Sequence, residues 1–237
     1  MIYVVGIGPG NRANMTAAAE AAIQDSQVIV GYKTYIDLIL PLIGDREVIQ
    51  NGMRREVDRC KAAIESSRKG NRVAVISSGD AGVYGMAGLI YELSDGADEI
   101  VVIPGVTASC AAASVVGAPL MHDFCHISLS DLLTPYELIQ KRVRCAAEAD
   151  FAMAIYNPRS NGRPDYLAET LETVRGIQGD LICAAVHDAG REEERYEIAT
   201  LSTLDVTKVG MTSIVLIGNR ATKLIDGRMV TPRGYQL

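Results

Sequence analysis

The residues best placed to do chemistry lie in three loops that are rich in glycine and small polar residues. They are residues 6–10 (GIGPG), 77–82 (SSGDAG) and 104–108 (PGVTA), and each follows a short apolar run that contains β-branched residues. In an open parallel sheet, ligands bind at the carboxyl ends of the strands, and glycine lets a ligand approach the backbone closely. The three loops together therefore predict a ligand site.

Asp80 is the only acid in these loops. Its carboxylate could accept hydrogen bonds from an ammonium or hydroxyl group of a ligand. It could also cap the helix that is expected to follow, because aspartate is a preferred N-cap residue. The two roles are compatible, so the sequence leaves both open.

The first loop departs from the Gly-x-Gly-x-x-Gly pattern of dinucleotide-binding proteins. Gly6 and Gly8 fit that pattern, but Asn11 stands where the third glycine is required. Pro9 also removes a backbone N–H that a pyrophosphate would bind. The loop therefore predicts either a ligand other than NAD or a tight β-to-α turn that binds nothing.

The second half of the chain carries polar residues at the ends of two further expected strands. Asn157 follows one strand, with Arg159 and Arg163 close behind it, and His187 and Asp188 end another. Isolated arginines are usually solvated surface residues. Here their clustering at strand ends indicates a local positive patch in an acidic chain, suited to a polyanionic small molecule.

The elements that must position these residues alternate between β-like and helical runs, which predicts an α/β fold with a parallel sheet in the first half. The second half adds a hairpin at 223–231, turned by Asp226 and Gly227, and so predicts a mixed sheet. The expected strands are 2–5, 27–31, 72–77, 99–103, 124–129, 151–156, 181–186, 196–200 and 213–218, and the expected helices are 15–24, 54–69, one from residue 83, one within 104–117, 135–147 and 164–176.

The regular pattern pauses at residues 117–122. We therefore expect two α/β domains, residues 1–118 with the glycine-rich loops and residues 119–237, with a ligand cleft between them. A chain of 237 residues is long enough for two small domains or one large one.

Composition limits the class of protein. The net charge of −6 argues against nonspecific binding to nucleic acid or to an anionic membrane. No apolar run is long enough to span a membrane, and no basic segment precedes an apolar one at the N-terminus, so we expect a cytoplasmic protein. The cysteines at 60, 110, 125, 145 and 183 show no Cys-x-x-Cys spacing, which predicts reduced thiols and no metal site.

Several longer motifs together resemble a known family, the tetrapyrrole methylases that use S-adenosylmethionine. These are the opening GIGPG, SSGDAGVYGMAG at 77–88, IPGVTASCAAASVVGAPL at 103–120 and MTSIVLIGN at 211–219. HDFCHISLSDLLTP at 122–135, IYNPRS at 155–160 and AGREEE at 189–194 are most similar to the branch that methylates precorrin-3B or cobalt-factor III at C17 during cobalamin synthesis. The resemblance covers nearly the whole chain.

The resemblance implies a homodimer that methylates ring D of the macrocycle and promotes contraction of the ring. Methyl transfer needs chiefly alignment of carbon, methyl and sulfur, whereas contraction needs an acid or base. His122, next to Asp123 at the expected domain junction, is the candidate for that proton transfer. Alternatively, His122 serves only to form a hydrogen bond with the backbone at this junction. By the same resemblance, S-adenosylmethionine contacts Pro9, Gly79, Asp80, Val83, Tyr84, Thr107, Ala108, Asn157, His187 and Thr212.

The sequence leaves two alternatives open. One is a related methylase that acts at another carbon of the macrocycle or on a protein residue. The other is a noncatalytic module that senses a nucleotide in the same cleft. Arg159 and Arg163 are the candidates for binding the substrate carboxylates, although both could be ordinary surface charges.

Overall fold

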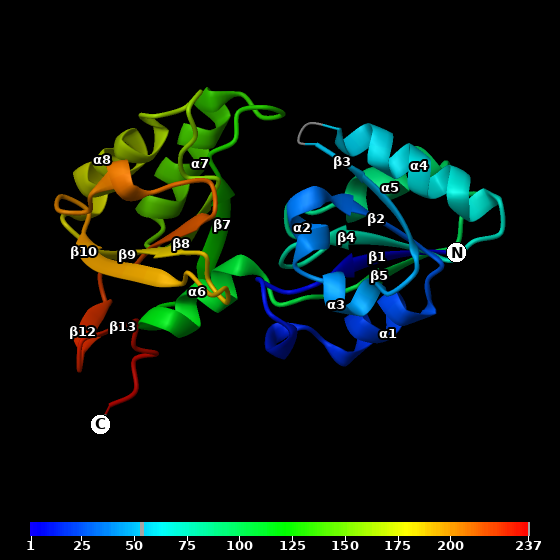
Figure 1. The fold of residues 1–237 in the computed structure, drawn as a ribbon. Helices are drawn as coiled ribbons and strands as arrows, with labels where there is room; N and C mark the ends of the chain where they lie inside the picture. The colour runs from blue at the N-terminus through cyan, green and yellow to red at the C-terminus, as the bar shows by residue number, and fades with distance from the viewer. Residues whose placement is uncertain (53–54, 237) are drawn as a thin grey trace. The chain divides into compact units, whose positions relative to one another are not determined.

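The structure is a computed structural model that describes residues 1–52 and 55–236. It divides into two compact units, Met1–Ala108 and Ser109–Leu237 (Figure 1). The sequence placed residues up to 118 in the first domain, whereas residues 109–118 lie in the second compact unit. The expected start of a helix at Arg54 lies outside the described residues.

The first unit contains a five-stranded sheet in the order β3-β2-β4-β1-β5, and every strand pair is parallel. This confirms the parallel sheet that the alternating pattern predicts. The sequence missed β3, because this edge strand is largely exposed and carries no buried apolar run. The strands are β1 (Ile2–Gly6), β2 (Val28–Tyr32), β3 (Glu47–Asn51), β4 (Val73–Ser77) and β5 (Ile100–Ile103).

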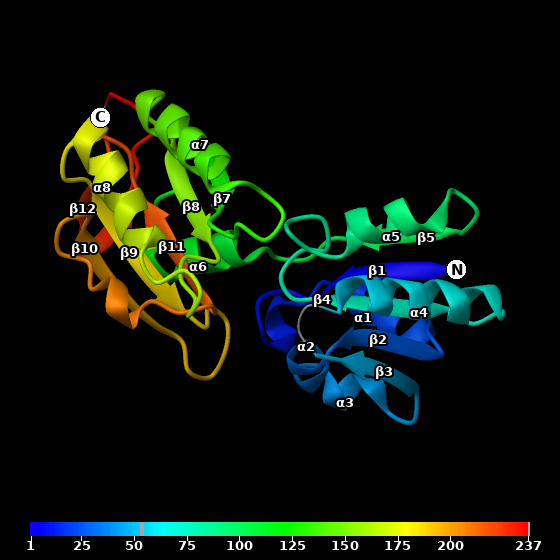
Figure 2. The ribbon, with the colours of Figure 1, turned by 90° about the horizontal axis from the view of Figure 1, so that it is seen from above.

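Helices cover both faces of this sheet (Figure 2). Ile2 and Val4 point to one face, where they pack with Cys60 and Ile64 of α4 and with α5. Val5 points to the other face and packs with α1, α2 and α3. This alternation follows from the period of two in a strand. The helices are α1 (Ala17–Asp25), α2 (Lys33–Asp37), α3 (Leu40–Ile43), α4 (Glu56–Arg68) and α5 (Ala87–Ser94), with the 3-10 turn η1 (Arg12–Asn14) before α1.

The second unit contains a mixed five-stranded sheet in the order β10-β9-β11-β8-β7. Strands β7 and β8 pair in parallel, and the other neighbours pair antiparallel. The mixed sheet that the sequence predicts is therefore confirmed. The strands are β7 (Phe124–Ser128), β8 (Ala152–Tyr156), β9 (Ile182–His187), β10 (Arg195–Thr200) and β11 (Ser213–Ile217).

A small third sheet closes the end of the second unit. The predicted hairpin is formed by β12 (Lys223–Ile225) and β13 (Arg228–Val230), and its turn residues Asp226 and Gly227 both have positive φ. Strand β6 (Gly117–Ala118) pairs in parallel with β13, and Thr231 donates a hydrogen bond to the carbonyl of Pro119 at 2.7 Å. These bonds tie the segment around residue 118 to the second unit.

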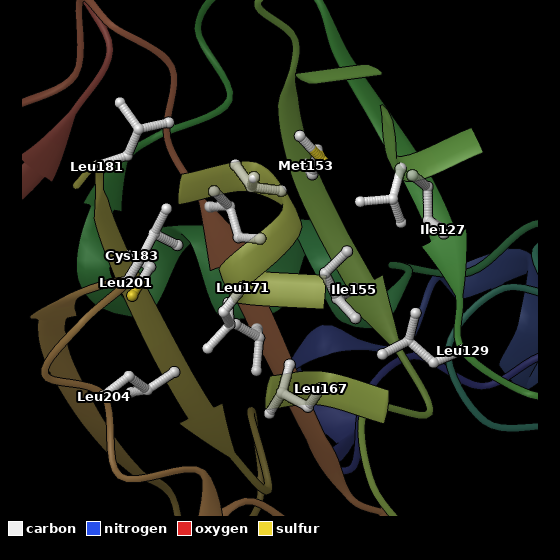
Figure 3. Packing of buried hydrophobic residues seen from close by; sticks show 14 of the residues in the cluster. Ile127, Leu129, Met153, Ile155, Leu167, Leu171, Leu181, Cys183, Leu201 and Leu204 are labelled. Atoms are coloured by element: carbon white, nitrogen blue, oxygen red, sulfur yellow. The ribbon is translucent and has the colours of Figure 1, made fainter. Parts of the chain in front are cut away.

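The core of the second unit lies between the sheet and two helices on one face (Figure 3). Ile127, Met153, Ile155 and Cys183 of the strands meet Leu171 of α8 there. Helix α6 lies on the other face. The helices are α6 (Ala108–Val116), α7 (Tyr136–Glu148) and α8 (Tyr166–Gln178), with the 3-10 turn η2 (Val206–Lys208) before β11. No helix among the described residues is long and apolar enough to cross a membrane.

Candidate functional site

The three glycine-rich loops of the first unit form one hydrogen-bonded edge. They follow β4, β1 and β5, which are adjacent parallel strands, so their carboxyl ends lie side by side. Gly8 and Gly79 exchange two backbone hydrogen bonds, of 3.0 and 2.8 Å. The backbone N–H of Gly105 donates to Oδ2 of Asp80 at 3.0 Å. The structure thus brings the three loops together, as the sequence predicts.

The glycines at this edge are needed chiefly for contact between the loops. A Cβ on Gly105 would lie 2.2 Å from the carbonyl oxygen of Gly79 and 2.6 Å from that of Gly6. A Cβ on Gly8, which has a φ of +75°, would lie 2.5 Å from the carbonyl oxygen of Asn14. A side chain on Gly105 would push the loops apart, and one on Gly8 would push the first loop away from the 3-10 turn η1. The sequence-based argument about ligand access did not anticipate either contact.

Asp80 joins the second and third loops. Besides accepting from Gly105, its carboxylate accepts through Oδ1 from the backbone N–H of Gly82 at 2.7 Å and of Val83 at 3.2 Å. The idea that it caps the next helix is wrong, because α5 begins only at Ala87 and has no side-chain cap bond. Three N–H donors leave a carboxylate, with about four lone-pair sites, able to accept one further bond from a ligand.

The other predicted contacts in the first unit lie along the same loops. Pro9 and Gly79 are buried, Val83, Thr107 and Ala108 are half-buried, and Tyr84 is exposed. Tyr84 has a φ of +54°, a left-handed conformation that is strained for an aromatic residue. Such strain is typical of binding loops that the surrounding structure holds in place.

Three predicted contacts of the second unit also share one edge of their sheet. Asn157 follows β8 and His187 ends β9, while Thr212 precedes β11, which runs antiparallel to both strands. The backbone N–H of Asp188 donates to the carbonyl of Thr212 at 3.2 Å. Asn157 and Asp188 both have a φ of +49°, so the chain turns sharply at both strand ends.

His187 is buried at this edge and hydrogen-bonded to a serine. Its Nδ1 lies 2.8 Å from Oγ of Ser213, the residue directly opposite it on β11. Burial lowers the pKa of His187, and the positive charge of Arg195 lowers it further. The sequence missed Ser213, since the pairing register of two strands cannot be read from either strand alone.

Arg163 and Arg159 have different surroundings. The Arg163 guanidinium is buried, with Nη1 donating to the carbonyls of Leu129 and Asn157 and Nε lying 3.6 Å from Oδ1 of Asp131. Arg159 is half-buried and donates through Nε to the carbonyl of Pro164 at 3.2 Å. Arg163 therefore holds the ends of β7 and β8 together, a contribution that the sequence did not suggest.

The two remaining histidines occupy contrasting places. His122 is exposed before β7, with Nδ1 3.9 Å from Oδ2 of Asp123. His126 lies within β7, where its Nε2 is 2.8 Å from Oγ of Ser109 and its ring packs near that of Tyr156. Burial lowers the pKa of His126. These contacts give His126 a packing role within the second unit.

The fold and the loops define the class of protein: an α/β protein in which adjoining loops meet at the carboxyl end of a parallel sheet, the place where open sheets of this kind bind ligands. Comparison with known proteins then identifies the family. The sequence pattern of the tetrapyrrole (corrin/porphyrin) methylases matches residues 1–205. The chain belongs to this family, which confirms the resemblance found in its motifs.

Individual relatives agree with this assignment. The chain is 52% identical over 241 residues to a protein of Salmonella typhimurium named as a probable cobalt-factor III C(17)-methyltransferase, and the match covers 100% of both chains. The crystal structure of the methyltransferase CobJ is 38% identical, with a TM-score of 0.93 over 98% of this chain and 99% of that one.

A uroporphyrin-III C-methyltransferase of Thermus thermophilus, solved in complex with S-adenosyl homocysteine, shares the fold. It is 22% identical, with a TM-score of 0.73 over 92% of this chain and 96% of that one.

Proposed function

We propose that this protein transfers a methyl group from S-adenosylmethionine to C17 on ring D of cobalt-factor III, in the biosynthesis of cobalamin. The observation that carries the proposal is the 52% identity, over the full length of both chains, to a probable cobalt-factor III C(17)-methyltransferase. Precorrin-3B is the other substrate that the branch-specific motifs at 122–135 and 155–160 fit.

The proposed methyl donor binds at the glycine-rich edge of the first unit. In support, a methyltransferase of the same fold was solved with S-adenosyl homocysteine. The residues also fit such a ligand, since Asp80 retains one acceptor site for its ammonium or hydroxyl groups. The proposed contacts are Pro9, Gly79, Asp80, Val83, Tyr84, Thr107 and Ala108, with Asn157, His187 and Thr212 from the second unit.

The donor supplies an electrophilic methyl on a sulfonium, so the protein needs chiefly to align the two reactants. Loops tied by backbone bonds and strained turns suit this task, because they hold a ligand without reorganising. Ring contraction requires proton transfer in addition. We propose His122 for that step, since it is exposed and beside the carboxylate of Asp123.

Substrate carboxylates require local positive charge in a chain whose net charge is −6. We propose that Arg159 provides it, because within the described residues its guanidinium makes one hydrogen bond, to a backbone carbonyl. The Arg163 guanidinium already donates to two backbone carbonyls and lies near the Asp131 carboxylate. Its proposed contribution is therefore to hold the neighbouring turn and to contact the substrate through the part of the guanidinium that remains exposed.

The proposed active form is a homodimer in the cytoplasm. Leu132 and Leu133 are 64% and 93% exposed, and Phe124 on the edge strand β7 is 38% exposed. Exposed apolar side chains and edge strands are both typical features of association surfaces. Sedimentation at micromolar concentration tests the assembly, and a monomer that methylates at full rate would refute the requirement for it.

Incubation with S-adenosylmethionine and either cobalt-factor III or precorrin-3B, followed by mass spectrometry, tests the function. We expect a product heavier by one methyl group and formation of S-adenosyl homocysteine. Binding of S-adenosyl homocysteine without transfer to either macrocycle would favour a noncatalytic sensing module. Tighter binding of NAD than of S-adenosyl homocysteine in calorimetry would exclude the proposed donor.

A further inference from the structure

The turn between Ser160 and Arg163 presents an asparagine followed directly by a glycine. The backbone N–H of Arg163 donates to the carbonyl of Ser160 at 3.0 Å, so Asn161 and Gly162 are the two central residues of a β-turn. Both central residues are exposed. The turn therefore presents the amide side chain of Asn161 and the backbone nitrogen of Gly162 to water together.

An asparagine side chain can react with the backbone nitrogen that follows it in the chain. The nitrogen attacks the side-chain carbonyl carbon, a carbon–nitrogen bond forms, and the side-chain amide leaves as ammonia. Water then opens the resulting cyclic imide at either carbonyl, which yields an aspartyl or an isoaspartyl residue. The whole conversion consumes one water and releases one ammonia, so it needs no oxidant, reductant or catalyst.

The surroundings of Asn161 favour this reaction. Gly162 has no Cβ, so its backbone nitrogen is open to close approach by the neighbouring side chain. The side chain of Asn161 has no hydrogen-bond partner among the described residues, so it is free to rotate onto that nitrogen. The exposed turn also supplies the water that opens the imide.

The other asparagine that precedes a glycine, Asn51, has different surroundings. Asn51 ends β3, and its Oδ1 accepts a hydrogen bond from Nη1 of Arg59 at 2.7 Å. Arg59 is only 4% exposed, and its Nη1 also donates to the carbonyl of Gly52 at 2.9 Å. Because these bonds hold both the side chain and the glycine, the fold protects Asn51 from the reaction that it leaves open to Asn161.

We propose that Asn161 is a site of spontaneous deamidation in the folded protein, and that the reaction adds a negative charge to the turn between Arg159 and Arg163. An exposed carboxyl group is ionised at neutral pH. The isoaspartyl product also lengthens the main chain by one carbon, which disrupts the hydrogen bond that closes the turn from Arg163 to Ser160.

The effect on the macrocycle rests on the proposed function, in which Arg159 binds carboxylates of the substrate. A new carboxylate within about 10 Å of that site repels a substrate carboxylate by an energy that corresponds to roughly a twofold to threefold rise in KM. Salt should reduce the effect, because exposed charges are screened. Deamidation would thus weaken substrate binding gradually as the protein ages.

Peptide mapping by mass spectrometry tests the site and requires no activity of the protein. Conversion at positions 161 and 51 is followed in the folded protein and in the same protein unfolded in guanidinium chloride. We expect conversion at 161 alone in the folded protein and at both positions in the unfolded one. The rate should rise with pH, because the attacking nitrogen must lose its proton. No conversion at 161 in the folded protein, or equal rates at 161 and 51 there, would overturn the proposal.

Gly162→Ala is the matched variant for the chemistry. A Cβ at this position would meet nothing within 4 Å, and Gly162 does not have a left-handed φ, so the turn accepts alanine. The variant should keep the melting temperature of the wild type and should slow conversion at Asn161 by about tenfold, because the methyl group hinders the attacking nitrogen. Conversion at the wild-type rate would overturn attack by this backbone nitrogen.

Asn161→Asp separates the effect of the charge from the reaction itself. Steady-state assays with cobalt-factor III should show a KM raised roughly twofold to threefold in Asn161→Asp and unchanged in Asn161→Gln, with a smaller difference at high salt. The same KM in both variants would refute the effect on the substrate. Absence of methyl transfer by the wild type would instead overturn the proposed function, whereas conversion at position 161 would still be measured.

Discussion

Replacing Asp80 with asparagine should separate its two functions as a turn former and as a tie between loops. Asparagine has the same shape, so its side-chain oxygen can still accept from Gly82 and Val83. Its amide N–H₂ would then face the backbone N–H of Gly105, and two donors cannot bond each other. Since a hydrogen bond to a charged group contributes roughly 1.5–3 kcal/mol, we expect the first unit to lose about 2 kcal/mol of unfolding free energy.

Asp80→Ala removes all three bonds and should cost about 3 kcal/mol, because water can replace only the bond to the exposed Gly82. Thermal unfolding measures both effects, and for a unit of this size Asp80→Asn should lower the melting temperature by roughly 10 °C. The affinity of the Asp80→Asn variant for S-adenosyl homocysteine should fall as well. Asp45→Asn, at an exposed carboxylate, is the control. If the Asp80→Asn variant has the same melting temperature as the wild type, the claim that Asp80 ties the loops together is refuted.

Further substitutions test the loops, the arginines and the pH dependence. Gly105→Ala should unfold the first unit or cost more than about 3 kcal/mol, whereas Gly88→Ala, with open space at its Cβ, should be neutral or slightly stabilising in thermal unfolding. Arg163→Gln should lower the melting temperature, while Arg159→Gln should keep stability and raise the KM for the macrocycle in steady-state assays. Burial lowers the pKa of His126 below its usual 6.5, so the unfolded chain takes up a proton first as the pH falls. The free energy of unfolding, measured with denaturant, should therefore decrease below pH 6.5. The decrease should be smaller in His126→Gln.

Contrary results would be equally informative. A stable Gly105→Ala protein would mean that the loops do not touch as closely as the structure has them. Loss of stability in Arg159→Gln, with Arg163→Gln unaffected, would reverse the assignment of the structural arginine. A stability profile that is the same in His126→Gln and the wild type would attribute the pH dependence to other groups.

The sequence predicted the parts of the fold that depend on local patterns. Buried β-branched runs identified β1 and β4, and adjacent parallel strands required their loops to gather at one edge. Strand β3 was missed because its side chains are largely exposed, and α5 was expected from Val83, although turns fixed by Asp80 delay it to Ala87. Motifs, rather than periodicity, identified the family.

The finer details of the site depend on contacts between distant parts of the chain. The need for glycine at position 105 follows from the nearby carbonyl of Gly79, and the hydrogen bond of His187 follows from the register that places Ser213 opposite it. Neither pairing leaves a signal within its own segment. Burial of Arg163 could not be predicted either, because its partners come from the ends of two other strands.

The most direct test of the proposed function is the position of the transferred methyl group. The protein should be incubated with cobalt-factor III and S-adenosylmethionine carrying carbon-13 in its methyl group, and the product examined by mass spectrometry and carbon-13 NMR. We predict a single labelled methyl, attached to C17 of ring D. A label at another carbon would identify a related methylase, and an unlabelled macrocycle in the presence of bound S-adenosyl homocysteine would contradict the proposed activity.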